Sequence, residues 1–425
     1  MITIRKTSEE SITALTSREV ESQDVTEVVA EILADVKQNG DEAIRAYTKK
    51  FDGAKLAELH VSEAEISSAI QETTPEFLAV LEQAKQNIQQ FHEKQVQRGF
   101  ITTDEQGTVM GQRVIPLEKV GVYVPGGTAA YPSTVLMDVL PAKIAGVSKI
   151  VMITPPNAEG KIPTAILAAA KIAGVDEIYK VGGAQGVAAL AYGTESLPKV
   201  DKIVGPGNIF VATAKRMVYG LVDIDMIAGP SDVLIVADES ANPRWLAADL
   251  LAQAEHDALA QAILVTTNEE LAQAVQVELQ AQLDALPRKE IAQHSIDNNG
   301  KLIVAKDIEE ALAIANQVAP EHLELCVAEP FSLLGKVKHA GSVFLGHYTP
   351  EVLGDYFAGP NHTLPTEGTA RFSSPLSVDD FIKKSSYLYY SKEALHTVAN
   401  QVIDFAEMEG LSGHARSMRV RKEEL

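Results

Sequence analysis

The amino-acid sequence predicts an α/β protein with two Rossmann-like, incompletely doubly wound domains and helical extensions at both ends of the chain. Two observations carry this expectation. From residue 120 onward, short apolar runs rich in Val and Ile alternate with helical patterns, and these runs fall into two series. Continuous apolar strands that alternate with helices are typical of parallel sheets covered on both faces. The chain of 425 residues is also long enough for two or three domains with sizeable cores.

The N-terminal part of the chain is predicted to be helical. Residues 25–51 and 75–98 carry apolar residues at mixed spacings of three and four, with polar faces between them. Residues 100–117 then alternate in polarity around Glu105-Gln106-Gly107, which predicts a hairpin.

The two series supply the predicted strands of the two sheets. In the first series, strands are expected at residues 120–124, 149–153, 177–181 and 202–204, with helices at 133–146, 163–173, 185–192 and 208–219. In the second, strands are expected at residues 233–237, 262–266, 301–305, 323–327 and 342–345, separated by helices at 243–255, 269–286 and 308–317.

The pattern becomes helical again after residue 376. Ser377-Val-Asp-Asp380 can form a helix N-cap with an acidic residue at the third helical position. Residues 392–409 place Leu395, Val398, Val402 and Phe405 on one apolar stripe. An apolar stripe of this kind is expected to pack against another surface.

Composition excludes several classes of partner. The formal net charge of -21 argues against nucleic acid or an acidic membrane surface, because both need basic patches. No stretch approaches the roughly 20 apolar residues of a membrane span, and the first residues lack the apolar core of a signal peptide, so we expect a cytoplasmic protein. The single cysteine, Cys326, excludes an internal disulfide and a thiolate-based zinc knuckle.

Three glycine-rich turns follow strands of the first series: Pro125-Gly-Gly127, Gly182-Gly183 and Gly205-Pro-Gly207. Turns at the carboxyl ends of parallel strands form the ligand crevice of an open α/β sheet, and glycine allows close approach of a phosphate or ring. None fits the dinucleotide fingerprint, since Phe210 stands where Gly205-Pro-Gly207 would need its third glycine. Each alone is most simply a tight turn, but together they favour a nucleotide-sized ligand.

The second series carries the polar residues that could perform chemistry. Gln253 and His256 stand three apart on a predicted helix and therefore share one face. Glu321 and His322 come directly before an apolar strand. Asp355, His362 and, near the break between two tail helices, His414 lie in stretches with little periodicity, where functional residues are common. An ordinary surface histidine explains His256 alone, and a helix stop at Gly410 with an exposed histidine explains His414 alone.

A zinc site is one arrangement that these residues could form. Zinc binds histidine nitrogens and carboxylate oxygens, and Gln253, His256, Asp355 and His414 could supply two nitrogens and two oxygens. Their spacing in the sequence does not show that they converge.

Taken together, the motifs resemble the histidinol dehydrogenase family. They occur in the family's order over residues 120–414, and nine motifs in order are highly specific although each alone is weak. The motifs are Gly121-Val-Tyr-Val-Pro-Gly-Gly127, Val181-Gly-Gly-Ala-Gln185, Gly205-Pro-Gly-Asn208, Ala228-Gly-Pro-Ser231, Gln253-Ala-Glu-His256, Pro320-Glu-His-Leu323, Gly341-Ser-Val-Phe-Leu-Gly346, Gly354-Asp-Tyr356 and Asn361-His362.

The resemblance implies a reaction and a set of site residues. Members of this family oxidise L-histidinol to L-histidine with zinc and two molecules of NAD, through an enzyme-held aldehyde. By the family pattern, the zinc ligands match Gln253, His256, Asp355 and His414, and the catalytic pair matches Glu321 and His322. Positions that touch NAD match Tyr123, Gln185 and Asn208. Substrate contacts match Ser231, His362 and Glu409 together with the zinc ligands and His322. Asp232 is a departure, because the pattern leads us to expect Glu after the Gly-Pro-Ser turn.

The resemblance also implies how the chain is divided. We expect an N-terminal arm over residues 1–22 and an NAD-binding Rossmann-like domain over residues 121–232. Residues 23–120 and 233–375 are expected to form a discontinuous domain that carries the zinc and catalytic residues. Residues 376–425 are expected to form a helical tail that crosses to the partner subunit of a homodimer and completes its active site.

The residues suggest a division of labour in the chemistry. A positioned histidine, His322, suits the removal of the alcohol proton, and Glu321 suits the activation of water that hydrates the aldehyde. Cys326 lies inside an apolar run and is expected to be a core residue, which favours a water route over a thioester route. Two alternatives remain: a zinc hydrolase and a non-catalytic, two-lobed ligand-binding protein.

Overall fold

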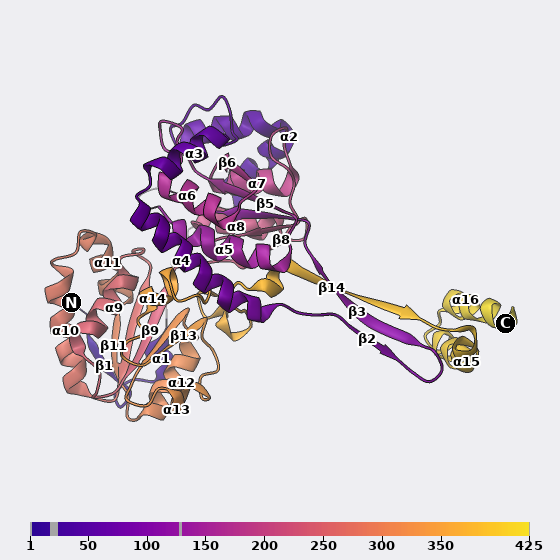
Figure 1. The fold of residues 1–425 in the computed structure, drawn as a ribbon. Coiled ribbons are helices and arrows are strands. Elements are labelled where there is room, and N and C mark those ends of the chain that lie inside the picture. The colour runs from indigo at the N-terminus through magenta and orange to yellow at the C-terminus, as the bar shows by residue number, and fades with distance from the viewer. Residues whose placement is uncertain (1, 18–23, 127–129, 425) are drawn as a thin grey trace. The chain divides into compact units, whose positions relative to one another are not determined.

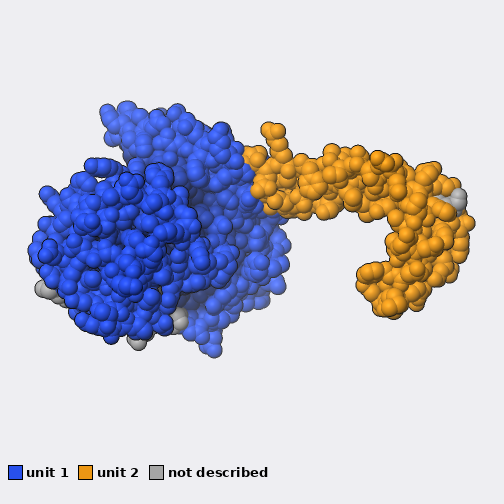
Figure 2. All heavy atoms as spheres, turned by 90° about the horizontal axis from the view of Figure 1, so that it is seen from below, with its two compact units in different colours: residues 1–95, 117–381 blue, residues 96–116, 382–425 orange. Residues whose placement is uncertain are grey.

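The computed structural model describes residues 2–17, 24–126 and 130–424 and divides the chain into two compact units. Unit 1 comprises residues 1–95 and 117–381, and unit 2 comprises residues 96–116 and 382–425 (Figure 2). The two predicted parallel sheets both lie in unit 1, which confirms the expected α/β fold class. No helix in the described part of the chain is long and apolar enough to cross a membrane.

The first series forms a five-stranded parallel sheet in the order β6-β5-β4-β7-β8. Its first strand in the chain is therefore central, and the strand order reverses between β4 and β7. This is the arrangement of a doubly wound sheet that lacks a sixth strand. The strands are β4 (Lys119–Tyr123), β5 (Lys149–Thr154), β6 (Glu177–Lys180), β7 (Lys202–Val204) and β8 (Asp223–Ile224).

Helices cover both faces of this sheet (Figure 1). Alternate residues of β4, such as Val122 and Tyr123, enter the cores on opposite faces, as the two-residue period of a strand requires. One face is covered by α3 (Glu63–Glu72), α4 (Pro75–His92), α5 (Pro132–Ala145) and α6 (Thr164–Ala173). The other is covered by α2 (Thr26–Phe51), α7 (Gly183–Tyr192) and α8 (Ile209–Val218).

The second series forms a six-stranded parallel sheet in the order β1-β11-β10-β9-β12-β13. Its strands are β1 (Ile4–Lys6), β9 (Asp232–Ala237), β10 (Gln261–Thr266), β11 (Lys301–Val304), β12 (His322–Cys326) and β13 (Ser342–Leu345). One face carries α9 (Pro243–Ala254), α10 (Glu269–Leu283) and α11 (Lys289–Asn299); the other carries α1 (Ile12–Thr16), α12 (Ile308–Val318) and α13 (Phe331–Leu334). The short helix α14 (Glu351–Tyr356) follows β13.

The N-terminal helices lie differently from the grouping that the sequence suggests. Residues 23–120 are expected with the second series, yet α2, α3 and α4 pack on the five-stranded sheet of the first series. From the N-terminal arm, β1 joins the six-stranded sheet through parallel pairing with β11, and α1 packs on one face of that sheet. The helices are amphipathic, and an apolar stripe does not record which of two sheets will cover it.

Unit 2 is built from an antiparallel sheet and two helices. The predicted hairpin is confirmed as β2 (Phe100–Thr103) and β3 (Val109–Pro116). The third strand, β14 (Ile382–Tyr389), pairs with β3 along its whole length, followed by α15 (Lys392–Met408) and α16 (Ser412–Glu423).

The helical pattern expected directly after residue 376 is wrong. The segment forms only a short 3-10 helix, η3 (Val378–Phe381), and then the strand β14. Seven of the eight residues of β14 are exposed, so the strand shows no alternation of polarity in the sequence. Hydrogen bonding to β3, and not burial, determines this strand.

Candidate functional site

The predicted catalytic pair lies at the amino ends of two neighbouring strands of the six-stranded sheet. Asp232 begins β9, and His322 begins the neighbouring strand β12, where it is in register with Val233. This parallel pairing brings Glu321, the residue before β12, against Asp232. The site is thus on the amino-terminal side of the sheet, at the point where the strand order reverses.

Glu321 and Asp232 hold each other through reciprocal hydrogen bonds. The backbone N–H of Glu321 donates to Oδ1 of Asp232 at 2.8 Å, and the backbone N–H of Asp232 donates to Oε2 of Glu321 at 3.1 Å. Nδ1 of His322 lies 3.3 Å from the carbonyl oxygen of Asp232. Because a carbonyl oxygen only accepts, Nδ1 carries the proton. The other ring nitrogen, Nε2, lies on the side of Asp355.

A cluster of possible metal ligands lies beside this histidine. One ligand atom each of His256, Glu351 and Asp355 falls within 4.8 Å of the others. Nε2 of His322 lies 3.5 Å from Oδ1 of Asp355, and its Nδ1 lies 4.0 Å from Oε1 of Glu351. Nitrogen and carboxylate oxygen donors of this kind suit zinc.

Burial and charge change the acidity of these groups. Burial raises the pKa of Glu321 to about 7 and that of Glu351 to about 8. Burial acts to lower the pKa of His322, but Glu351, Glu321 and Asp355 outweigh it and raise that pKa well above its ordinary value. Burial acts to raise the pKa of Asp355, but its hydrogen bond and charge interaction with His322 hold that pKa below its ordinary value. The site therefore stabilises positive charge on His322.

Glu351 is a site residue that the sequence analysis missed. It begins α14 and stands four residues before Asp355, so both side chains lie on one face of that helix. The four-residue spacing of two acidic residues is the signal that could have found it. Acidic residues are common in the first turn of any helix, so the signal was inconspicuous.

The other predicted ligands come from two places. Gln253 is buried in the last turn of α9, and the chain leaving this helix carries His256. His414 lies in the first turn of α16, and Glu409 caps the end of α15, so both belong to unit 2. Within unit 1, therefore, the structure brings together two of the four expected ligands, His256 and Asp355, in one cluster.

His362 is fixed in one protonation form. Its Nδ1 lies 2.9 Å from the carbonyl oxygen of Asp355, which makes Nδ1 the donor. Burial lowers the pKa of His362, so the ring is neutral and its Nε2 presents a lone pair. Ser231 stands directly before β9, and its carbonyl oxygen accepts from the N–H of Gln261 at 3.0 Å.

The residues expected to touch NAD gather at the carboxyl edge of the five-stranded sheet. Tyr123 ends β4, and its hydroxyl oxygen accepts from the N–H of Gly183 at 3.2 Å. Asn208 follows β7 and caps α8, accepting from the N–H groups of Phe210 and Val211. Gln185 lies in the first turn of α7 and is buried. Since β4 and β7 are neighbours at the reversal of strand order, this edge is where a doubly wound sheet binds its ligand.

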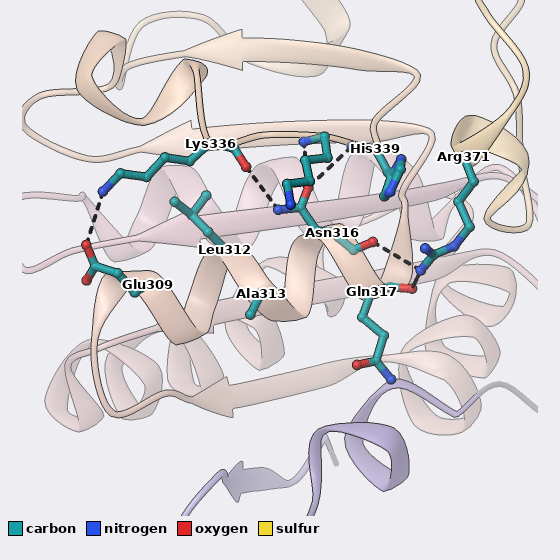
Figure 3. Close-up of a pocket in the computed structure, with 9 residues that line it drawn as sticks. Glu309, Leu312, Ala313, Asn316, Gln317, Lys336, His339 and Arg371 are labelled. Carbon is teal, nitrogen blue, oxygen red and sulfur yellow. Dashed lines mark hydrogen bonds and ion pairs between the residues drawn. The ribbon is translucent and has the colours of Figure 1, made fainter.

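A surface pocket beside α12 contains none of the predicted residues (Figure 3). Its polar groups are engaged with one another. Asn316 accepts from the N–H groups of Lys338 and His339 and donates to the carbonyl oxygen of Lys336, whose ammonium pairs with Glu309. The polar groups that line this surface pocket therefore hold one another in place.

Comparison with known proteins gives one consistent result. The family model described as histidinol dehydrogenase matches residues 15–422. The histidinol dehydrogenase of Bacillus cereus (strain ATCC 10987 / NRS 248) is 59% identical over 396 residues, which cover 93% of this chain and 92% of that protein. That of Listeria monocytogenes serovar 1/2a is 57% identical over 408 residues, covering 96% and 94%. The crystal structure of histidinol dehydrogenase from Elizabethkingia anophelis superimposes with a TM-score of 0.94 at 40% identity, covering 100% of this chain and 98% of that one.

Proposed function

The chain belongs to the histidinol dehydrogenase family and is an NAD-dependent oxidoreductase, and on this premise we propose which residues oxidise L-histidinol to L-histidine. One observation carries the assignment. The Glu321–Asp232 pair holds a carboxylate and His322 side by side, and His322 lies 3.5 Å from a member of the metal-binding cluster. A base for the alcohol, a carboxylate that activates water and a cation site are the three parts that the reaction needs.

Zinc and NAD are the cofactors of this family, and the residues fit both. For zinc, we propose Gln253, His256, Asp355 and His414 as ligands; the compact donor group of His256 and Asp355 supports two of them. For NAD, we propose Tyr123, Gln185 and Asn208 at the edge where the strand order reverses. When bound, zinc supplies a Lewis acid that holds the imidazole and amine of the substrate, and NAD supplies a hydride acceptor.

His322 is the proposed base of the first oxidation. In its deprotonated form, Nε2 takes the hydroxyl proton of histidinol while a hydride leaves the carbon that bears this hydroxyl, which gives the aldehyde. Nδ1–H remains bonded to the carbonyl oxygen of Asp232, so the ring keeps its orientation during the transfer. Glu351, 4.0 Å from Nδ1, stabilises the imidazolium that forms.

Glu321 is the proposed base of the second oxidation. It takes a proton from the water that adds to the aldehyde carbon, and the resulting hydrate anion loses a second hydride to give the carboxylic acid, which releases its proton to become the carboxylate. Oε2 is held by the N–H of Asp232, which leaves Oε1 to meet the water. Cys326 takes no part: it is buried, and its thiol donates to Glu324 at 3.7 Å.

The substrate is proposed to contact residues of both sheets. Ser231 and the neutral His362 would receive its polar groups, with Nε2 of His362 accepting from a hydroxyl or amine. Glu409 and His414 of the tail would complete the contacts. The remaining contacts are the proposed zinc ligands and His322.

The protein is proposed to be a homodimer in which each tail completes the partner's site. Unit 2 supports this proposal because several of its large apolar side chains are exposed. Phe405 and Met408 of α15 are 69% and 89% exposed, and Phe100, Ile101, Leu388 and Tyr389 of the sheet are exposed as well. Exposed apolar surface of this extent is typical of a subunit interface. The stripe that contains Val402 and Phe405 would be buried there.

The direct test is an assay with L-histidinol and NAD in the zinc-loaded enzyme. Two NADH should form for each histidinol consumed, with histidine as the product. A zinc hydrolase would form no NADH, and a binding protein would leave histidinol unchanged. Formation of a single NADH with accumulation of the aldehyde would contradict the role of Glu321.

A further inference from the structure

Asp138 is a buried acid that neither sheet requires for packing. It lies in α5 with no solvent exposure. Its Oδ1 accepts from the hydroxyl of Thr363 at 2.8 Å, and its Oδ2 is buried with no hydrogen-bond partner in the described part of the chain. Burial raises the pKa of Asp138 to about 8, so the side chain is neutral at pH 7. Burying a carboxyl group costs free energy unless it is hydrogen-bonded, and of the two oxygens of Asp138 only Oδ1 has such a partner in the described part of the chain.

The first side of Asp138 holds the loop that carries His362. Thr363 follows His362, and Asn361 precedes it. Asn361 donates to the carbonyl oxygen of Met137 at 2.7 Å and accepts from the N–H of Thr363 at 2.8 Å. Two adjacent residues of α5, Met137 and Asp138, therefore form hydrogen bonds with the residues on either side of His362. The loop has no helix or strand of its own, so these bonds fix its position.

The second side of Asp138 meets the turn that leads to Asn208. Gly205 has a φ of +111°, and a Cβ at this position would lie 3.1 Å from Oδ2 of Asp138 and 2.1 Å from the carbonyl oxygen of Tyr123. The glycine turn is thus packed directly on Asp138 and on the end of β4. Buried Lys215 donates to the carbonyl oxygen of Gly205 at 2.9 Å and pairs with Asp225, which accepts from the N–H of Gly205.

We propose that Asp138 is a positioning residue that couples the two binding sites, holding the His362 loop through Thr363 and seating the Gly205 turn beside it. Binding of histidinol and binding of NAD or NADH then strengthen each other, because each ligand orders a segment that rests on the same side chain. The inference rests on the proposed contacts of His362 with histidinol and of Asn208 with the dinucleotide. Asp138 itself touches neither ligand.

The test measures histidinol affinity by calorimetry in the zinc-loaded enzyme, with and without saturating NADH, which cannot support turnover. In the wild type, NADH should tighten histidinol binding. Thr363→Val removes the hydroxyl at nearly constant shape and should weaken histidinol binding in the presence of NADH by about 10-fold, the scale of one lost hydrogen bond to a buried acceptor. In this variant, NADH should leave the affinity for histidinol nearly unchanged. Thr363→Ser keeps the hydroxyl and serves as the matched control, which should bind within about twofold of the wild type.

Variants of Asp138 separate positioning from general stability. Asp138→Asn keeps an oxygen acceptor and should preserve the NADH effect, whereas Asp138→Leu should abolish it. The double variant Asp138→Leu, Thr363→Val should be no weaker than Asp138→Leu alone, because both remove one interaction. If Asp138→Leu does not fold, Thr363→Val and Thr363→Ser still test whether the two binding sites are coupled. A lower Tm with an unchanged NADH effect, or no NADH effect in the wild type, would overturn the proposal.

A separate variant distinguishes this inference from the proposed function. His362→Ala should weaken histidinol binding whatever the role of Asp138. Unchanged binding in His362→Ala would remove the assignment of His362 and with it the basis for coupling. Weakened binding in His362→Ala together with an unaffected Thr363→Val would leave the proposed function intact and refute the coupling alone.

Discussion

Glu321 and Asp232 exchange hydrogen bonds across neighbouring parallel strands, each backbone N–H donating to the other's carboxylate, at 2.8 and 3.1 Å. The pair exists because β9 and β12 are adjacent although 89 residues separate the two side chains in the chain. An aspartate is long enough to make this contact, which explains how Asp232 can stand where the family pattern suggests Glu. The pair also holds the carboxylate of Glu321, the proposed base of the second oxidation.

Glu321→Gln is expected to separate the two half-reactions. The amide keeps the shape of the side chain but cannot take a proton from water, so oxidation of histidinaldehyde should fall by about 100-fold or more. Oxidation of histidinol should suffer less, because His322 remains. Single-turnover measurements of NADH formation from each substrate check this. His322→Asn is the control and should slow both steps; an equal loss in both steps for Glu321→Gln would refute the division of labour.

The second half-reaction should depend on pH through Glu321. Burial raises the pKa of this group to about 7, and only its ionised form accepts a proton. The rate of aldehyde oxidation should therefore rise with pH up to about 7 and level off above it. Asp232 also raises the pKa of Glu321 by charge repulsion, so Asp232→Asn should move this limb to lower pH. If the rise of the rate with pH occurs at the same pH in Asp232→Asn as in the wild type, Glu321 is not the group that causes it.

The metal is expected to serve catalysis and not folding. Both sheets have extensive apolar cores, so they do not need zinc to fold. Chelation should abolish activity, added zinc should restore it, and the far-ultraviolet circular dichroism should barely change. His256→Ala should mimic the chelated state without chelator. Loss of secondary structure on chelation would assign the metal a structural role instead.

Mixed dimers test whether the tail serves the partner subunit. His256→Ala and His414→Ala are each expected to be inactive. When they are unfolded together and refolded, about half of the dimers should be mixed, and each mixed dimer should have one intact site of two. About a quarter of the wild-type activity should return. If dimers shown to be mixed remain inactive, His414 acts within its own subunit or is not a ligand.

The stability of the protein should depend on pH through Asp138. Its pKa is about 8 in the folded chain and near 3.8 in the unfolded chain, so between these values only the folded state keeps the proton. The contribution of Asp138 to the free energy of unfolding should therefore fall by about 1.4 kcal/mol for each pH unit between about 4 and 8. Asp138→Asn has no such proton to lose. The Tm of this variant, relative to that of the wild type at the same pH, should therefore rise from pH 5 to pH 8. A constant difference in Tm would show that the folded state holds no extra proton at Asp138 over this pH range.

The sequence determined the predicted strands of the two sheets because each of them is a continuous apolar run, and burial on both faces is visible locally in such a run. The short edge strands β1 and β8 lack such a run and were not predicted. The burial of Cys326 followed from its apolar run, and the hairpin from the alternation around its turn. The family motifs likewise identified the reaction and placed Glu321 and His322 at the start of a strand. The roles of the individual site residues and the exchange of tails stay predictions.

Only the tertiary structure decided which distant segments meet. The exposed strand β14 has no polarity pattern, since its pairing with β3 uses backbone groups that every residue has. The amphipathic helices α2, α3 and α4 each carry an apolar stripe that could pack on either sheet. In the structure they pack on the five-stranded sheet. Glu351 and Asp138 resemble ordinary polar residues of helices. Glu351 lies in a group of possible metal ligands, and Asp138 lies between Thr363 and the Gly205 turn. Both surroundings arise from contacts between residues far apart in the chain, which a local sequence pattern does not encode.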